Sequence, residues 1–155
     1  MCSPGWEEGC KSCSFWADQY DTVANHIAAR DVALAVVSRA SWQEVQPFKE
    51  RMEWQFPWVS ASEISFNLDY QVSRPGGGQG VYNYHDAAVM EEMAGLSVLI
   101  KDDEGRVAHT YSCYSRGLDA LNATYQILDL VPKRRDEETI DFTMSWVQHH
   151  DRYED

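Results

Sequence analysis

The spacing of hydrophobic residues predicts a helix followed by a buried strand in the first quarter of the chain. Trp16, Tyr20, Val23 and Ile27 recur at steps of four, three and four, which places them on one face of a helix that ends near Arg30. The run VALAVVS that follows Asp31 is β-branched and has no polar alternation, which is typical of a strand covered on both faces. We therefore expect a helix and then a buried, parallel strand.

The next segment predicts a short helix and a second strand. Ser41 and Glu44 have the spacing of a capping box, although Pro47 would kink a helix that begins there or mark its true first turn. In FPWVSA, Pro57 forces an extended residue before it, and Trp58 and Val59 favour a sheet.

The glycine-rich stretch SRPGGGQGVYNYHD predicts a surface loop, because it has four glycines within five residues. It lacks the lysine that a phosphate-binding loop requires. The stretch LSVLIKDDEGRVAHTYSCY has two β-rich runs around an acidic turn that ends in Gly105, which predicts an antiparallel hairpin.

A last helix and a docked tail are predicted after this hairpin. Leu118, Leu121, Tyr125 and Leu128 form a helical stripe that Pro132 stops. The tail beyond Pro132 is mostly polar, and we expect its apolar residues to dock a final turn onto the body while its two histidines stay solvated; these residues are Phe142, Met144, Trp146, Val147, His149 and His150.

Composition favours one globular domain, residues 1–155, because 44% of the residues are hydrophobic and 25% are charged. The net charge of −12 disfavours nucleic acid and anionic membrane surfaces as partners.

The longest apolar run, Val32 to Val37, is far shorter than the roughly 20 residues of a membrane span. The first residues carry neither a basic patch nor an apolar core, so we expect a cytoplasmic protein rather than a secreted one.

The order of these elements predicts an α/β protein with the thioredoxin plan. That plan is a three-layer sandwich. Its mixed sheet ends in an antiparallel hairpin, and helices cover both faces of the sheet. One element is missing. In the thioredoxin plan a central strand leads directly into a pair of cysteines, here Cys10 and Cys13, but Met1 to Gly9 contains Pro4, Gly5 and Gly9 and cannot make that strand. A second subunit could fill the pairing edges left by that strand, so a homodimer is a further expectation.

The chemistry centres on Cys10 and Cys13, a Cys-x-x-Cys pair at the start of the first helix. Residues at i and i+3 share a helix face, and the free N–H groups of the first turn stabilise a thiolate. Lys11 adds a positive charge, while Glu7 and Glu8 oppose it. The pattern predicts Cys10, with a lowered pKa, as the attacking thiol and Cys13 as the resolving thiol.

Other interpretations of these residues stay open. A structural zinc site would need two further ligands from Cys2, Cys113, His26, His85 and His109, and a soft metal held by the dithiol and His109 is a further option. The two cysteines could instead be simply buried thiols. Cys113 and His109 fit ordinary strand residues, and Arg116 fits either a surface ion pair or an anchor for a peroxide oxygen or an acidic partner.

The chain resembles a bacterial family of thioredoxin-like proteins, the domain of unknown function 899. The resemblance rests on six blocks: WEEGCKSCSFWAD, ARDVALAVVSRA, FPWVS, YNY, GLSVLIKDDEGRVAHTYSCYSRGLDALN and LDLVPKRRDE. It implies a thioredoxin-like fold with a dithiol at Cys10 and Cys13, but no known reaction. The chain departs from the family in lacking a longer N-terminal part, which indicates a truncated product or a fragment.

Two comparisons within the wider superfamily qualify this resemblance. Ordinary thioredoxins place a cis-proline just before the hairpin, where this chain has MAGLSV. Peroxiredoxins place their peroxide-reactive cysteine where Cys13 would align, and by that analogy Cys13 would attack peroxide and Cys10 would resolve it.

We therefore expect a thiol–disulfide oxidoreductase that acts on a protein or small-molecule disulfide without an organic cofactor or a metal. The alternatives are a thiol peroxidase with Cys13 as the peroxidatic residue, and a non-catalytic binding module. Four candidate supporting residues accompany the dithiol: Trp6, Lys11, Ser12 and Arg116.

Overall fold

The computed structural model describes residues 4–5 and 8–154 and has a mixed α/β architecture. The chain divides into two compact units, one made of residues 1–65 and 121–155 and the other of residues 66–120. Among the described residues, the first unit contains one two-stranded sheet and the second contains two. No helix in the described part of the chain is long and apolar enough to cross a membrane.

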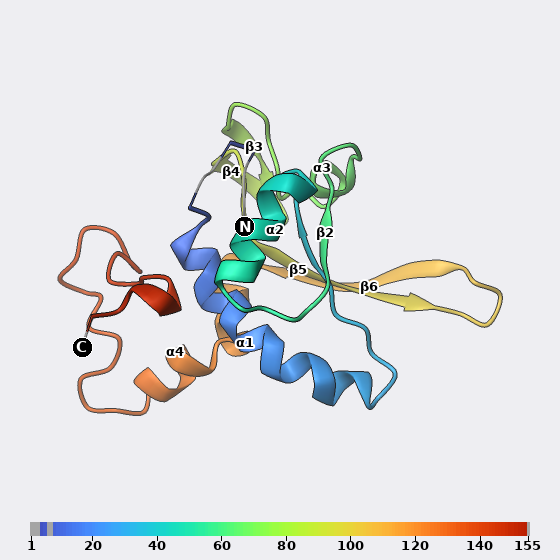
Figure 1. The fold of residues 1–155 in the computed structure, drawn as a ribbon. Helices are drawn as coiled ribbons and strands as arrows, with labels where there is room; N and C mark the ends of the chain where they lie inside the picture. The colour runs from blue at the N-terminus through green and yellow to red at the C-terminus, as the bar shows by residue number, and fades with distance from the viewer. Residues whose placement is uncertain (1–3, 6–7, 155) are drawn as a thin grey trace. The chain divides into compact units, whose positions relative to one another are not determined.

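The first unit begins with the predicted helix and strand. Helix α1 spans Lys11–Ala28, and strand β1 spans Val36–Ser38 (Figure 1). The strand pairs in parallel with β2, Trp58–Ser60, and Val36 lies opposite Trp58. These observations confirm both strands and their parallel direction. The predicted stripe of α1 is covered only in part, since Val23 is 44% exposed and the buried residues are Ser14, Phe15 and Ala17.

Helix α2, Trp42–Arg51, begins at the predicted capping box. The Glu44 carboxylate accepts hydrogen bonds from the backbone N–H and the hydroxyl of Ser41, both at 2.8 Å. Pro47 lies within this helix. The segment that follows alternates buried and exposed side chains, which is the period of an extended chain. Its buried members, together with Val45 and Phe48 of α2, form the core of the unit: Met52, Trp54, Phe56 and Trp58.

The C-terminal part of this unit packs against the start of α1. Helix α4 spans Ala123–Leu128, and a short 3-10 helix, η2, spans His150–Arg152. Val147 is 1% exposed and clusters with Phe15 and Tyr125, with Met144 and Trp146 packed against them, as predicted. The prediction is wrong for Phe142, which is 67% exposed, and for His149, which is only 3% exposed.

The second unit contains two antiparallel hairpins after a short helix, α3, Phe66–Asp69. Strands β3, Gly78–Tyr82, and β4, His85–Val89, form the first hairpin. The loop predicted for this glycine-rich stretch is therefore wrong. Pairing with β4 supplies the backbone hydrogen bonds that the glycines could not organise by themselves, and Asn83 and Tyr84 make the turn with φ values of 54° and 66°.

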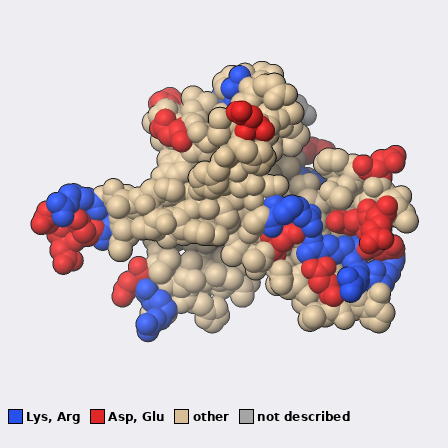
Figure 2. Space-filling model, turned by 180° about the vertical axis from the view of Figure 1, so that it is seen from behind, with Lys and Arg blue, Asp and Glu red and all other residues tan. Residues whose placement is uncertain are grey.

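The second hairpin confirms the strongest local prediction. Strands β5, Gly95–Lys101, and β6, Val107–Tyr114, pair with one irregularity in register between Val98 and Leu99. A 3-10 helix, η1, follows at Ser115–Leu121. Figure 2 shows the charged residues of the hairpin turn gathered at its tip, where Arg106 pairs with Asp102 and Glu104.

Candidate functional site

The two cysteines lie together at the N-terminal end of α1, where the sequence predicted them. Cys10 is the N-cap residue, with an extended backbone (φ −90°, ψ 117°), and Cys13 is the third residue of the helix. The Cys10 Sγ atom accepts a hydrogen bond from the backbone N–H of Cys13 at 3.3 Å. Both thiols are free and half-buried. The cap therefore brings a thiol sulfur onto one of the unpaired N–H groups of the first turn.

Ser14 anchors the cap from inside the helix. Its backbone N–H and its hydroxyl both donate to the Cys10 carbonyl oxygen, at 2.9 and 2.8 Å. Ser14 is fully buried. The backbone of Cys10 is therefore held from within the first unit.

The two thiols also share a side-chain hydrogen bond, and this bond separates their pKa values. It lowers the pKa of Cys13 to about 6, because the Cys10 thiol donates its proton to the Cys13 thiolate. The same bond, together with burial, raises the pKa of Cys10. This direction differs from the sequence-based expectation, in which Cys10 carried the lowered pKa. The N-cap position lets Cys10 accept from a backbone N–H and donate to the neighbouring sulfur, so Cys10 holds its proton.

The candidate supporting residues have different surroundings. Lys11 is exposed, and its ammonium group donates to the Gln148 side-chain oxygen at 2.7 Å. Ser12 is half-buried in the first turn of α1. Arg116 belongs to the second unit, where it pairs with Asp119 at 2.8 Å and is 62% exposed. Trp6 lies outside the described residues. A role for each of these residues at the dithiol stays a prediction.

Metal ligation was an open alternative for the cysteine pair. Among residues 4–5 and 8–154, no three or more His, Cys, Asp or Glu side chains gather in a way that could hold a metal ion. Cys2, one of the proposed ligands, lies outside this range. His109 is exposed on β6, and its Nε2 lies 2.9 Å from the Tyr111 carbonyl oxygen. A carbonyl oxygen only accepts hydrogen bonds, so this nitrogen is the donor and Nδ1 is the nitrogen with a free lone pair.

Sequence reasoning missed His149. Its Nδ1 accepts a hydrogen bond from the Arg51 guanidinium at 3.0 Å, across 98 residues of sequence. Its ring also packs edge-on against Phe48, with 5.5 Å between ring centroids. Nothing local marks this histidine, because both partners come from α2. Only the folded chain shows that the C-terminal segment lies beside the residues that lead into Cys10.

The shared thiol bond makes a direct prediction for reactivity. We expect the rate of Cys13 alkylation by iodoacetamide to rise with pH through a midpoint near 6, since the thiolate is the form that reacts. An unperturbed thiol would show a midpoint at about 8.5. In Cys10→Ala, which removes the donor, the midpoint should move toward the unperturbed value. Cys10→Ser keeps a hydroxyl donor and should stay below the alanine variant. A wild-type midpoint at the unperturbed value would contradict the hydrogen bond.

Comparison with known proteins places the chain in one family. It belongs to the family described as "Bacterial protein of unknown function (DUF899)", whose model matches residues 1–153. No curated protein and no solved structure matches the chain. The family membership predicted from the sequence is therefore confirmed, and it brings no assigned reaction with it.

Proposed function

We propose that this chain is a cytoplasmic thiol–disulfide oxidoreductase that works by reversible formation of a disulfide between Cys10 and Cys13. The observation that carries the proposal is the capped dithiol. The Cys10 sulfur accepts a hydrogen bond from the N–H of Cys13, and both thiols are free and half-buried rather than sealed in the core. A pair three residues apart at a helix start is close enough to join.

The proposed reaction moves two electrons from the dithiol to a substrate disulfide. The Cys13 thiolate attacks one sulfur of the substrate, forms a mixed disulfide and releases the other half of the substrate as a thiolate. Cys10 then loses its proton and attacks the Cys13 sulfur, which releases the second half. The products are a Cys10–Cys13 disulfide and two substrate thiols, and a cellular dithiol reductant would restore the protein.

The order of attack in this scheme differs from the sequence-based assignment. The lowered pKa of Cys13 supports Cys13 as the first nucleophile, and the raised pKa of Cys10 supports Cys10 as the resolving thiol. A thiol whose pKa lies near the ambient pH is the best attacking group, because it combines a high thiolate fraction with retained nucleophilicity.

We also infer a thioredoxin-like arrangement for the fold. What supports it is the order of elements along the chain: dithiol, α1, β1, α2, β2, hairpin β5–β6 and α4, with α3 and the β3–β4 hairpin inserted after β2 and η1 inserted before α4. The parallel pair β1–β2 and the antiparallel pair β5–β6 are the two kinds of pairing that such a mixed sheet requires.

The test is oxidation of the reduced protein under mild conditions. In a glutathione redox buffer, the wild-type chain should lose two thiols together and gain an internal disulfide that mass spectrometry maps to Cys10 and Cys13. Cys113→Ser should behave in the same way, because Cys113 lies outside the pair. A chain that stays folded and fully reduced across the accessible range of potentials would contradict the proposal.

A thiol peroxidase is the second candidate, favoured by the lowered pKa of Cys13. Here the Cys13 thiolate would attack one peroxide oxygen, take it up as a sulfenic acid and release water or an alcohol. Cys10 would then displace water from the sulfenic acid and form the same disulfide. Peroxide consumption that exceeds reaction with a disulfide, and that survives in Cys10→Ser but not in Cys13→Ser, would select this candidate.

A non-catalytic binding module would show a different pattern. Its thiols would titrate at about 8.5, as unperturbed thiols do, and the folded protein would turn over neither disulfide nor peroxide.

A further inference from the structure

The residue before the dithiol packs directly on an aromatic ring. Gly9 has φ +69°, and a Cβ atom added to it would lie 2.5 Å from Cζ and 2.6 Å from Cε1 of Phe48. Contacts this short do not occur between real atoms, so only glycine fits both the conformation and the space. The backbone that leads into Cys10 therefore rests against the edge of the Phe48 ring.

The Phe48 ring is itself held from several sides. Its side chain is 6% exposed, and the Trp54 ring meets it edge-on at 5.4 Å between centroids. The Arg51 guanidinium carbon lies 5.6 Å from its centroid, and the His149 ring meets it at 5.5 Å. Arg51 and His149 are joined to each other by the hydrogen bond to Nδ1. Phe48 is thus fixed between the chain at Gly9 and the C-terminal segment.

The protonation state of His149 follows from this contact. Arginine only donates hydrogen bonds, so Nδ1 must be the acceptor and the imidazole proton sits on Nε2. Burial and the neighbouring Arg51 lower the pKa of His149, so the ring is neutral at pH 7. Asp151, Lys11 and Glu8 are the other charged groups that act on it.

The Nε2–H group of His149 is buried and has no hydrogen-bond partner among the described residues. An unpartnered buried donor costs about 1–3 kcal/mol. A purely apolar ring would fill the same space without that cost but would leave the Arg51 guanidinium without its Nδ1 acceptor, so a histidine here serves more than packing.

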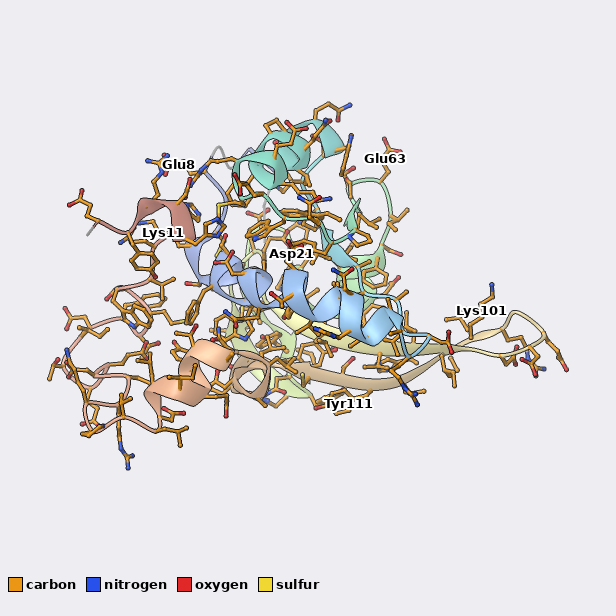
Figure 3. All side chains as sticks on the ribbon, turned by 60° about the horizontal axis from the view of Figure 1, so that its bottom comes forward. Glu8, Lys11, Asp21, Glu63, Lys101 and Tyr111 are labelled. Carbon is orange, nitrogen blue, oxygen red and sulfur yellow. The ribbon has the colours of Figure 1, made fainter. Side chains whose placement is uncertain are left out.

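The other side of Cys10 is tied to the same segment. Lys11 donates to Gln148, the neighbour of His149, at 2.7 Å, and Arg51 donates twice to Asp151 at 2.8 Å. Figure 3 shows Glu8 and Lys11 at the start of α1, beside the short helix η2. The residues on both sides of Cys10 are therefore linked to the C-terminal segment. Gly9 contacts Phe48, which packs against His149, and Lys11 donates to Gln148.

We propose that Gly9, Phe48 and His149 form a positioning stack that fixes the Cys10 thiol over the first turn of α1 and so sets how readily the Cys10–Cys13 pair is oxidised. This inference rests on the proposed function. None of the three residues takes part in the exchange itself, and each acts through the backbone of Cys10. The Cys10 sulfur accepts from the N–H of Cys13 at 3.3 Å, so a small displacement of Gly9, the residue before Cys10, weakens this bond and moves the sulfur relative to Cys13.

The test compares two substitutions in the same hydrophobic core. Phe48→Leu removes the ring edge that supports Gly9, whereas Phe56→Leu alters a ring that is 2% exposed and packs against Trp54 and Trp58. Both variants lose stability, which urea unfolding measures. We expect Phe48→Leu to change the equilibrium constant for the Cys10–Cys13 disulfide in a glutathione buffer by about tenfold, equivalent to about 30 mV. Phe56→Leu should change it by less than about twofold.

His149→Phe is the second variant, because it keeps an aromatic ring and removes both the acceptor for Arg51 and the unpartnered donor. A residue with only a packing role would leave the disulfide equilibrium and the pH midpoint of Cys13 alkylation at their wild-type values. In His149→Phe we expect the equilibrium constant of the Cys10–Cys13 disulfide to change by about threefold and the pH midpoint of Cys13 alkylation to shift. The free energy of unfolding should fall by less than about 1 kcal/mol.

The two proposals fail in different ways. If the wild-type chain forms the disulfide and His149→Phe, folded, matches its equilibrium and pH midpoint, the positioning stack is wrong and the proposed function stands. Equal shifts in folded Phe48→Leu and Phe56→Leu would also overturn the stack. If the folded wild-type chain forms no internal disulfide, the proposed function fails and the inference fails with it.

Discussion

Replacing Cys13 with serine should slow attack on a low-molecular-weight disulfide at pH 6 by about tenfold or more. With a pKa of about 6, roughly half of Cys13 is thiolate at this pH. An ordinary thiol with a pKa of about 8.5 is thiolate to roughly 0.3%. The advantage in thiolate is therefore about 150-fold, and the lower intrinsic nucleophilicity of a more acidic thiol offsets it by about 15-fold. In this variant burial still raises the pKa of Cys10, so Cys10 is the poorer substitute.

The matched variant is Cys10→Ser. It should still attack, but the reaction should stop at a mixed disulfide on Cys13, because no second thiol resolves it. Stopped-flow kinetics with oxidised glutathione at pH 6, followed by intact mass, measures both the rate and the product. A larger loss of rate in Cys10→Ser than in Cys13→Ser would show that Cys10 attacks first, as the sequence alone predicted.

The largest effect on stability is expected from Glu137→Ala. One carboxylate oxygen of Glu137 accepts hydrogen bonds from the Tyr125 hydroxyl at 3.1 Å, the Met144 N–H at 3.0 Å and the Trp146 indole N–H at 2.7 Å. Truncation removes the acceptor that these three donors share in a half-buried region, which should cost about 3 kcal/mol of unfolding free energy in urea.

Two controls make this prediction specific. Glu138→Ala removes the neighbouring carboxylate, which is exposed, and should change stability by less than about 0.5 kcal/mol. Glu137→Gln keeps an amide oxygen as an acceptor and should retain much of the lost stability. Equal losses for Glu137→Ala and Glu138→Ala would show that the three hydrogen bonds add nothing to the docking of the C-terminal segment.

Local signals in the sequence were sufficient for most of the secondary structure. The start of α1, the capping box of Ser41 and Glu44, and the β5–β6 hairpin depend on residues a few positions apart. Two of the failures share one cause. The β3–β4 hairpin depends on a partner strand to organise a glycine-rich run, and the burial of His149 depends on α2, about a hundred residues earlier.

The candidate site divides in the same way. The positions of Cys10 and Cys13 at the first turn of a helix could be predicted from the sequence, because the spacing of two cysteines before an amphipathic run is a local property. Which of the two cysteines has the lowered pKa could not be predicted from the sequence. The sequence shows the helix end that favours a thiolate but not which sulfur donates to the other, and that depends on the rotation of each side chain about its own bonds.

The sequence by itself determined a helix with a dithiol at its first turn, an antiparallel hairpin and membership in a family without an assigned reaction. The helix and the hairpin follow from interactions between residues that are close together in the sequence. Only the tertiary structure placed the Phe48 ring under Gly9 and the neutral ring of His149 beside it. Such contacts join residues far apart in sequence, and they form only when the whole core has closed around them.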